Sequence, residues 1–121
     1  MADKVVDASA LAALIFGEPE ADWVEARLAR HRLTAPALLP FEMASVCLKK
    51  LRQNPRERAA ILARFAKLSA FPVELYPVEP TAMVEAAELL GLTAYDASYL
   101  LLARATAAEL VTLDAELARA M

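Results

Sequence analysis

Four acidic residues follow short apolar runs of the sequence or stand in the first turn of an expected helix. They are Asp7, Glu42, Asp96 and Asp114. In an open α/β sheet, the carboxyl ends of the strands and the amino ends of the helices share one edge, where ligands bind. Carboxylates gathered at that edge would repel one another strongly unless a cation lay between them. Their placement therefore predicts a metal site.

The side chains that the sequence offers limit which metal such a site would hold. The sequence has one histidine, one cysteine and therefore no C-x-x-C pair, which excludes a zinc finger or a histidine-rich site. Oxygen ligands remain, and they favour Mg²⁺ or Mn²⁺. With only two glycines, Gly17 and Gly91, the chain also lacks the glycine cluster of a phosphate-binding loop or a dinucleotide fingerprint.

Each acid also has a purely structural interpretation. Asp7 and Asp114 follow expected strands and precede expected helices, so either can cap a helix. Asp96 stands three residues after Thr93, as in a capping box. Glu42 lies in a first turn, where the helix dipole favours a negative charge. For any single acid, capping is the simpler explanation, whereas the four together favour a site.

Two hydroxyl side chains close to these acids support the site hypothesis. Ser9 stands two residues after Asp7, and Thr112 stands two residues before Asp114. Hydroxyls in these places can orient the carboxylates by hydrogen bonds. Ordinary turn or cap chemistry is the alternative for both.

The apolar pattern predicts the elements that must position the acids. Strands are expected at 4–6, 33–35, 73–76 and 110–113. Alternation of such strands with longer helices predicts an α/β fold with three layers, α/β/α, around a parallel sheet of four short strands, or five. Helices are expected at 9–16, 19–31, 40–53, 56–70, 79–90 and 93–106, and from 114 onward.

The net charge of −3 conceals an uneven distribution. Residues 27–67 carry ten basic and two acidic side chains, whereas the segments on either side are acidic. A basic segment in an acidic protein suggests contact with a polyanion, although helix faces merely solvated by Arg and Lys are the alternative. The candidate nucleic-acid contacts are Arg27, Arg30, Lys49 and Arg52.

Size and composition predict one domain over residues 1–121 in a soluble, cytoplasmic protein. The longest apolar run, 10–16, is too short to cross a bilayer. The first residues lack the basic-then-apolar pattern of a signal peptide. A single cysteine, Cys47, excludes an internal disulfide.

The sequence resembles the PIN domain family, and within it the VapC toxins of bacterial and archaeal toxin–antitoxin pairs. The matching stretches are V-V-D-A-S-A-L from residue 5, P-F-E-M-A-S-V from 40, G-L-T-A-Y-D-A-S-Y from 91 and L-V-T-L-D-A-E-L-A from 110. They span nearly the whole chain in the family's order. The Tyr-Asp-Ala segment followed by Thr-Leu-Asp is the most specific part.

This resemblance implies that Asp7, Glu42, Asp96 and Asp114 form the family's acidic quartet. The implied activity is cleavage of RNA phosphodiester bonds with Mg²⁺ or Mn²⁺, in which Asp7 and Asp96 hold the ion directly. Asp114 and Glu42 would bind that ion or a second one. The resemblance also implies a cognate antitoxin, a homodimer and no membrane contact. Family members usually add a fifth strand after the last helix, where this sequence reaches Met121.

Two other classes of function remain open. A PIN fold used only to bind RNA or protein would lack turnover, and the presence of all four acids argues against it. A phosphotransferase of the haloacid-dehalogenase or receiver type also places an Asp at a strand end. It needs a further acid near the first strand and a late lysine, whereas Ser9 follows Asp7 and no lysine follows Lys67. Tyr95 and Tyr99 flank the expected site, and we expect them to pack rather than take part in chemistry.

Overall fold

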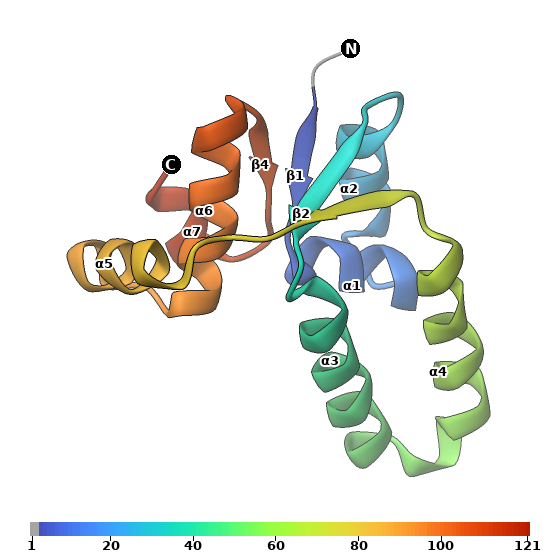
Figure 1. The fold of residues 1–121 in the computed structure, drawn as a ribbon. Coiled ribbons are helices and arrows are strands. Elements are labelled where there is room, and N and C mark those ends of the chain that lie inside the picture. The colour runs from blue at the N-terminus through green and yellow to red at the C-terminus, as the bar shows by residue number, and fades with distance from the viewer. Residues whose placement is uncertain (1–2) are drawn as a thin grey trace.

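A single parallel sheet organises the computed structural model, which describes residues 3–121. The strands are β1 (Lys4–Val6), β2 (Leu33–Pro36), β3 (Val73–Tyr76) and β4 (Glu109–Val111), in the order β3-β2-β1-β4 (Figure 1). The four-stranded form of the prediction is therefore the one observed, and residues 3–121 contain no fifth strand.

The helices follow the predicted order along the chain. Within the described residues they are α1 (Ala8–Phe16), α2 (Ala21–Leu28), α3 (Leu39–Gln53), α4 (Arg58–Phe65), α5 (Pro80–Leu90), α6 (Ala94–Thr106) and α7 (Ala115–Arg119). Two short 3-10 helices, η1 (Pro55–Glu57) and η2 (Ala66–Ala70), flank α4. None of these helices is both long enough and apolar enough to cross a bilayer.

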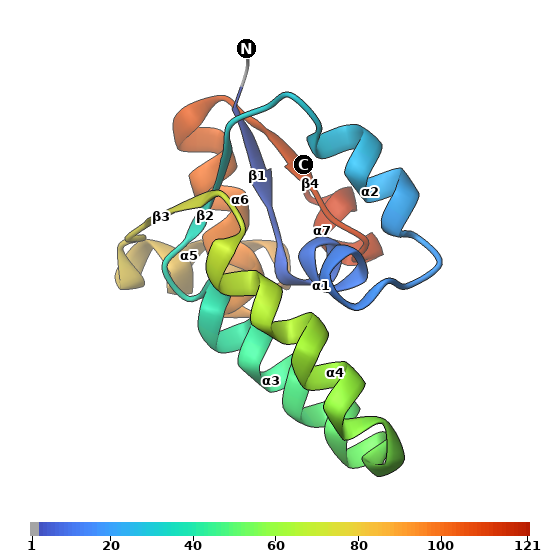
Figure 2. The same ribbon diagram turned by 90° about the vertical axis from the view of Figure 1, so that its right-hand side faces the viewer.

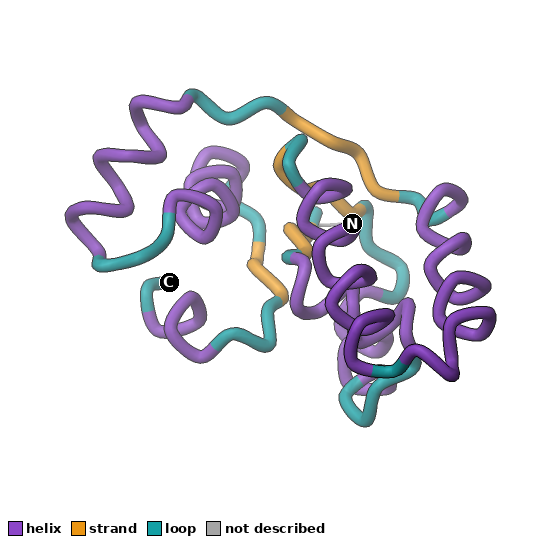
Figure 3. The backbone as a smooth tube through the Cα atoms, turned by 90° about the horizontal axis from the view of Figure 1, so that it is seen from below, coloured by secondary structure: helices purple, strands orange, loops and turns teal. Residues whose placement is uncertain are grey.

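Helices cover both faces of the sheet and give the expected three layers (Figure 3). On one face, α6 packs against β1, β2 and β4, and α5 packs against α6 from outside. On the other face, α1 packs against α2, α3 and α4. The buried core between the layers includes Val5 and Val6 of β1, Leu11 of α1, Leu100 of α6 and Leu117 of α7.

The strand order creates a topological switch point between β1 and β4. From β1 the chain builds outward to β2 and then β3, and it later returns to add β4 on the other side of β1. Such a reversal leaves a crevice at the carboxyl ends of the strands, where ligands bind in open α/β sheets. Val6 pairs with Val111 in the register of the two strands, so the residues that follow each one meet at this crevice.

The hairpin formed by α3, η1 and α4 projects away from the sheet (Figure 2). We call residues 39–65 the basic arm. The arm is fixed to α1, because the Phe65 ring stacks on Phe16 at 6.3 Å and Arg64 donates a 2.7 Å hydrogen bond to the Phe16 carbonyl. Lys50 forms a 2.7 Å ion pair with Glu18. Part of the positive charge of this segment therefore serves the fold.

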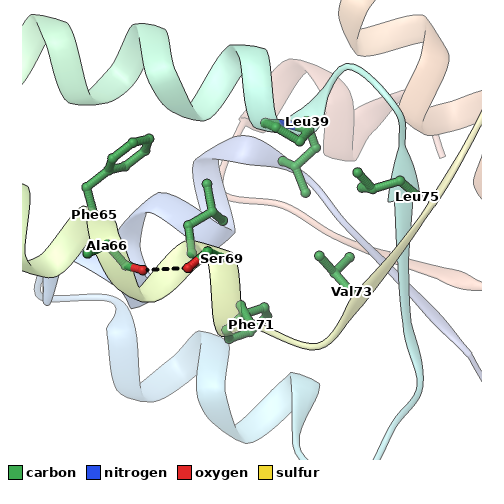
Figure 4. A pocket seen from close by; sticks show the side chains of 9 residues that line it. Leu39, Phe65, Ala66, Ser69, Phe71, Val73 and Leu75 are labelled. Atoms are coloured by element: carbon green, nitrogen blue, oxygen red, sulfur yellow. Dashed lines mark hydrogen bonds between the residues drawn. The ribbon is translucent and has the colours of Figure 1, made fainter.

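An apolar pocket of about 520 Å³ lies between the start of α3 and the segment that leads from η2 into β3 (Figure 4). Leu39, Phe65 and Val73 are among its lining residues, and Ser69 donates a 3.1 Å hydrogen bond to the Ala66 carbonyl. No charged or histidine side chain lines it. This pocket therefore offers no group for acid–base or metal chemistry.

Candidate metal centre

Asp7 is the most deeply buried acid of the predicted quartet. It directly follows β1, caps α1 and is only 4% exposed. Its Oδ1 accepts hydrogen bonds from the Ala10 backbone N–H at 3.0 Å and from the Ser9 hydroxyl at 2.7 Å, and its Oδ2 accepts one from the Thr112 hydroxyl. Burial raises the pKa of Asp7, these hydrogen bonds lower it, and nearby Asp114 raises it. The carboxylate is thus oriented but poorly solvated.

The hydroxyls of Ser9 and Thr112 join the first turn of α1 to the loop after β4. The two oxygens lie 3.3 Å apart. The backbone N–H of Leu113 donates to the Ser9 hydroxyl, and that of Asp114 donates to the Thr112 hydroxyl, both at 2.9 Å. Each hydroxyl donates to Asp7 and accepts a backbone hydrogen bond from the loop after β4, an arrangement that can orient the Asp7 carboxylate.

Glu42 lies in the first turn of α3 and is held from across the site by Tyr99 of α6. The Tyr99 hydroxyl donates a 2.6 Å hydrogen bond to Glu42 Oε1. Burial raises the pKa of Glu42, the hydrogen bond from Tyr99 lowers it, and the charges of Asp96 and Asp7 raise it. Burial and then the neighbouring carboxylate raise the pKa of Tyr99.

The expectation that Tyr99 only packs was incomplete. Its ring is 1% exposed and lies in the core, but its hydroxyl reaches the candidate site. The sequence did carry a signal for this, because residues three apart share a helix face and Tyr99 is three residues after Asp96. The partner of the hydroxyl, Glu42, comes from another helix and has no local signal.

Asp96 and Asp114 complete the quartet from α6 and α7. Thr93 caps α6 by accepting a 3.0 Å hydrogen bond from the backbone N–H of Asp96, as the predicted capping box requires. Burial raises the pKa of Asp96, and so do the charges of Asp114 and Asp7. Asp114 caps α7 through Oδ1, which accepts two backbone hydrogen bonds, including one of 2.9 Å from Glu116.

The four carboxylates share one electrostatic neighbourhood. Asp7 and Asp96 each act on Glu42, and Asp7 and Asp114 each act on Asp96, always raising the pKa of the neighbour. Among residues 3–121, the ion pairs of Lys and Arg engage other acids and none of these four. The structure thus brings the quartet together and leaves its charge uncompensated by basic side chains of the described chain.

The donor set fits a hard divalent cation. All four side chains offer carboxylate oxygens, which Mg²⁺ and Mn²⁺ prefer. As the side chains stand, no group of three or more acidic, histidine or cysteine residues within 3–121 is arranged to hold a metal ion. Carboxylates repel one another, so without a cation between them their oxygens stay apart. Because Mg²⁺ usually takes one or two carboxylates and several waters, a close cage of protein ligands is not required.

The candidate nucleic-acid contacts fall into two separate places. Arg27 lies at the amino edge of the sheet, 3.7 Å from Glu109 at the start of β4, and Arg30 precedes β2 at the same edge. The acids lie at the opposite, carboxyl edge. Lys49 and Arg52 are exposed on the basic arm, whose first helix begins at the carboxyl edge. The structure therefore does not bring Arg27 and Arg30 next to the quartet.

Fold and site together define a small α/β domain with an acidic centre at its topological switch point. The PIN domain family matches residues 4–121, and the chain belongs to this family. The identification of a PIN domain from the sequence is thereby confirmed.

Two solved structures are similar to this one. A crystal structure of PAE2754 from Pyrobaculum aerophilum shares 32% identity and a TM-score of 0.76, over 96% of this chain and 82% of that chain. VapC20 of Mycobacterium tuberculosis, a toxin described as cleaving the sarcin–ricin loop, shares 18% identity and a TM-score of 0.69, over 98% and 95%. The fold is therefore also that of a VapC-type protein. A comparison with curated proteins found no match.

Proposed function

We propose that this chain is a single PIN domain that cleaves RNA with the help of Mg²⁺ or Mn²⁺, as the toxin of a type II toxin–antitoxin pair. PIN domains are generally nucleases. One observation carries the proposal: Asp7, Glu42, Asp96 and Asp114 stand at helix starts on the carboxyl edge of the sheet, and no ion pair within residues 3–121 neutralises them. The charges of Asp7 and Asp96 reach Glu42, and the charge of Asp114 reaches Asp7 and Asp96.

The four carboxylates divide the work of holding the cation. Asp7 and Asp96 would bind it directly, and Asp114 and Glu42 would bind the same ion or a second one, through water where needed. When bound, a divalent cation lowers the pKa of a coordinated water and neutralises charge that develops on phosphoryl oxygens. The hydrogen bonds that hold Asp114 and Glu42 each use one carboxylate oxygen, Oδ1 and Oε1. The second oxygen is the one that would face the ion.

The remaining residues of the site orient the carboxylates. Ser9 and Thr112 hold Asp7 in one orientation through their hydroxyls. Tyr99 does the same for Glu42. Carboxylates that are already held in one orientation need to move less when metal and substrate bind. Hydrogen-bonded partners tune a metal site in this way.

RNA as the substrate is supported by the charge on the basic arm. Lys49 and Arg52 are exposed there, about 10–15 Å along α3 from Glu42 at 1.5 Å per residue. They would contact backbone phosphates of a strand that crosses the acidic centre. We place the activity in the cytoplasm, where such RNA occurs.

A cognate antitoxin and a homodimer form the second part of the proposal. Exposed apolar side chains support them, because Val84 and Leu89 of α5 are 61% and 83% exposed and Leu75 of β3 is 43% exposed. Exposed apolar side chains mark protein interaction sites where they form a contiguous patch, and we propose that these contribute to one. Sedimentation equilibrium of the purified chain, alone and with a candidate antitoxin, tests both partners.

A cleavage assay tests the nuclease function. We expect the chain to cut single-stranded and hairpin RNAs with Mg²⁺ or Mn²⁺, to stop in EDTA and to recover with excess Mg²⁺. A sarcin–ricin loop hairpin belongs in the panel because VapC20 is described as cleaving that loop. Asp96→Asn should lower kcat by a factor on the order of 100 or more, since it removes a charged group from the reacting centre.

Glu88→Gln provides the matched control for this assay, because it removes an exposed acid of α5 away from the quartet. It should leave the rate unchanged. Cleavage that persists in EDTA, or full activity of Asp96→Asn, would refute the metal mechanism. RNA binding without turnover in any metal would instead identify a binding module.

A further inference from the structure

Two large aromatic side chains next to the acidic centre are exposed. Phe41 of α3 is 76% exposed and Tyr95 of α6 is 60% exposed. Each directly precedes a member of the quartet, Glu42 and Asp96 respectively. With most of its surface exposed, neither ring serves the core.

The two rings border one cavity of about 260 Å³. Its other lining residues are Leu38, Ser45 and Glu42. Positions 41, 42 and 45 share one face of α3 by helical spacing, Leu38 immediately precedes the helix, and Tyr95 approaches from α6. The cavity therefore joins two helices and has aromatic, apolar and polar parts. Because Glu42 also belongs to the quartet, the cavity opens directly beside the acidic centre.

The chemistry of this lining selects a flat, uncharged ligand. No lysine or arginine lines the cavity and Glu42 does, so a phosphate would meet a negative charge there. Aromatic side chains stack on nucleobases, and every base has a face suited to such stacking. The Ser45 hydroxyl and the Glu42 carboxylate offer hydrogen bonds to the edge of a base.

We propose that this cavity receives an unpaired nucleobase of the RNA, next to the phosphate that the acidic centre engages. The inference rests on the proposed function, which brings RNA to this edge of the sheet. The base must be unpaired, because a base stacked within a duplex cannot present its face to Phe41 and Tyr95. The cavity thus favours single-stranded loops or ends over continuous duplex.

Binding of intact RNA tests the cavity separately from cleavage. The assay uses the Asp7→Asn background, which keeps RNA uncut, with a fluorescently labelled single-stranded RNA of mixed sequence. The same RNA is also made with one abasic nucleotide at successive positions. Added Phe41→Ala or Tyr95→Ala should each weaken binding about tenfold, the scale of a lost base–aromatic stack.

Conservative and control variants test whether the aromatic ring itself is what RNA binding requires. Phe41→Tyr and Tyr95→Phe keep a ring and should retain the affinity. Met121→Ala removes another exposed apolar side chain, one with no part in the proposed sites, and should have no effect on RNA binding. For one abasic position, RNA affinity of the Asp7→Asn protein should fall by about the same factor of ten. With that same abasic RNA, the added Phe41→Ala or Tyr95→Ala should weaken the affinity no further.

Each other outcome decides between the proposals. Cleavage that stays EDTA-sensitive with unchanged KM and RNA affinity in both alanine variants leaves the nuclease standing and overturns the base cavity. Ring-dependent RNA binding without cleavage by the unmodified chain supports the cavity and overturns the nuclease. A loss of affinity that is the same for every abasic RNA overturns the cavity. So does a change of oligomeric mass with unchanged RNA affinity, because the rings would then contact a second copy of this chain.

Discussion

Asp7 caps α1 and also lies within the candidate site, although the sequence presented capping and a site as alternatives. Its Oδ1 caps α1 by accepting from Ala10, while its carboxylate as a whole lies against the hydroxyls of Ser9 and Thr112. A cap uses only part of the capacity of a carboxylate, which has about four acceptor positions. Capping therefore does not argue against ion binding. The same reasoning applies to Asp114, whose two cap bonds go to a single oxygen.

Substitution of Asp7 by Asn should change how the stability of the metal-free domain depends on pH. Burial raises the pKa of Asp7 in the folded state above its ordinary value of 3.8. The folded state then binds this proton more tightly than the unfolded chain. The resulting stabilisation is complete below about pH 3.8 and is lost as the pH rises through the folded pKa. Asp7→Asn removes this loss, so its stability relative to the parent should improve from acidic to near-neutral pH.

Urea unfolding in EDTA across this pH range measures the effect. Asn is itself a good helix cap, so α1 should keep its start. Glu88→Gln, on the surface of α5, should run parallel to the parent chain at every pH. Parallel curves for Asp7→Asn as well would show that burial does not raise the pKa of Asp7 in the folded domain.

Removal of the Tyr99 hydroxyl should impair Glu42 without unfolding the domain. Tyr99→Phe keeps the buried ring and deletes the 2.6 Å hydrogen bond, at a stability cost of about 1 kcal/mol. That bond lowers the pKa of Glu42, so its loss should raise this pKa further. The acidic limb of the pH–rate profile should therefore move to higher pH and kcat should fall. Tyr95→Phe is the control, and an unmoved pH profile in Tyr99→Phe would contradict the role.

At the scale of elements, the sequence predicts what local patterns control. The starts of α1, α6 and α7 fall within one residue of the expected positions because each has a capping side chain at its own N-terminus. The helix expected at 19–31 ends at Leu28, because Ala29 leaves the helical conformation and Arg30 adopts a φ of 66°. The helix expected at 56–70 is α-helical only over Arg58–Phe65 and tightens into 3-10 turns at both ends.

Local sequence patterns could not predict contacts between elements that are distant in the chain. The pairing of Arg27 with Glu109 depends on α2 meeting β4. The bond between Tyr99 and Glu42 depends on α6 meeting α3. The four acids, in contrast, could be predicted together because the edge of a parallel sheet is a consequence of topology alone.

The basic arm should set the salt dependence of RNA binding. Alanine at both Lys49 and Arg52 should weaken binding and make the slope of log K against log salt shallower by about 0.7 per lost phosphate contact. Alanine at Arg27 and Arg30 should change the slope less, because they lie at the other edge of the sheet and Arg27 already pairs with Glu109. Titrations of single-stranded RNA at several salt concentrations measure both slopes. A larger effect from the second pair would place RNA at the amino edge.

For the molecule as a whole, the uncompensated acids are a source of instability that a cation would relieve. Mg²⁺ or Mn²⁺ that binds only the folded state should raise the thermal unfolding midpoint, by a stability increment of about 2.7 kcal/mol at a hundred times Kd. EDTA should reverse the shift. Mild acid should also weaken it, because burial and like charges raise the pKa values of Asp7, Glu42 and Asp96 and protons then compete with the metal.

Scanning calorimetry with and without each cation measures this stabilisation. In Asp96→Asn the midpoint should respond much less to Mg²⁺, whereas Glu88→Gln should respond like the parent chain. An equal response in Asp96→Asn would place the bound ion somewhere other than the acidic centre.

The hydroxyl bridge between Ser9 and Thr112 joins residues 103 positions apart. During translation, Asp7 and Ser9 leave the ribosome long before the strand that carries Thr112 is synthesised. A nascent chain therefore has no assembled acidic centre until β4 has paired with β1. For a protein that cuts RNA, this order of synthesis would keep the growing polypeptide harmless to the message and the ribosome that produce it.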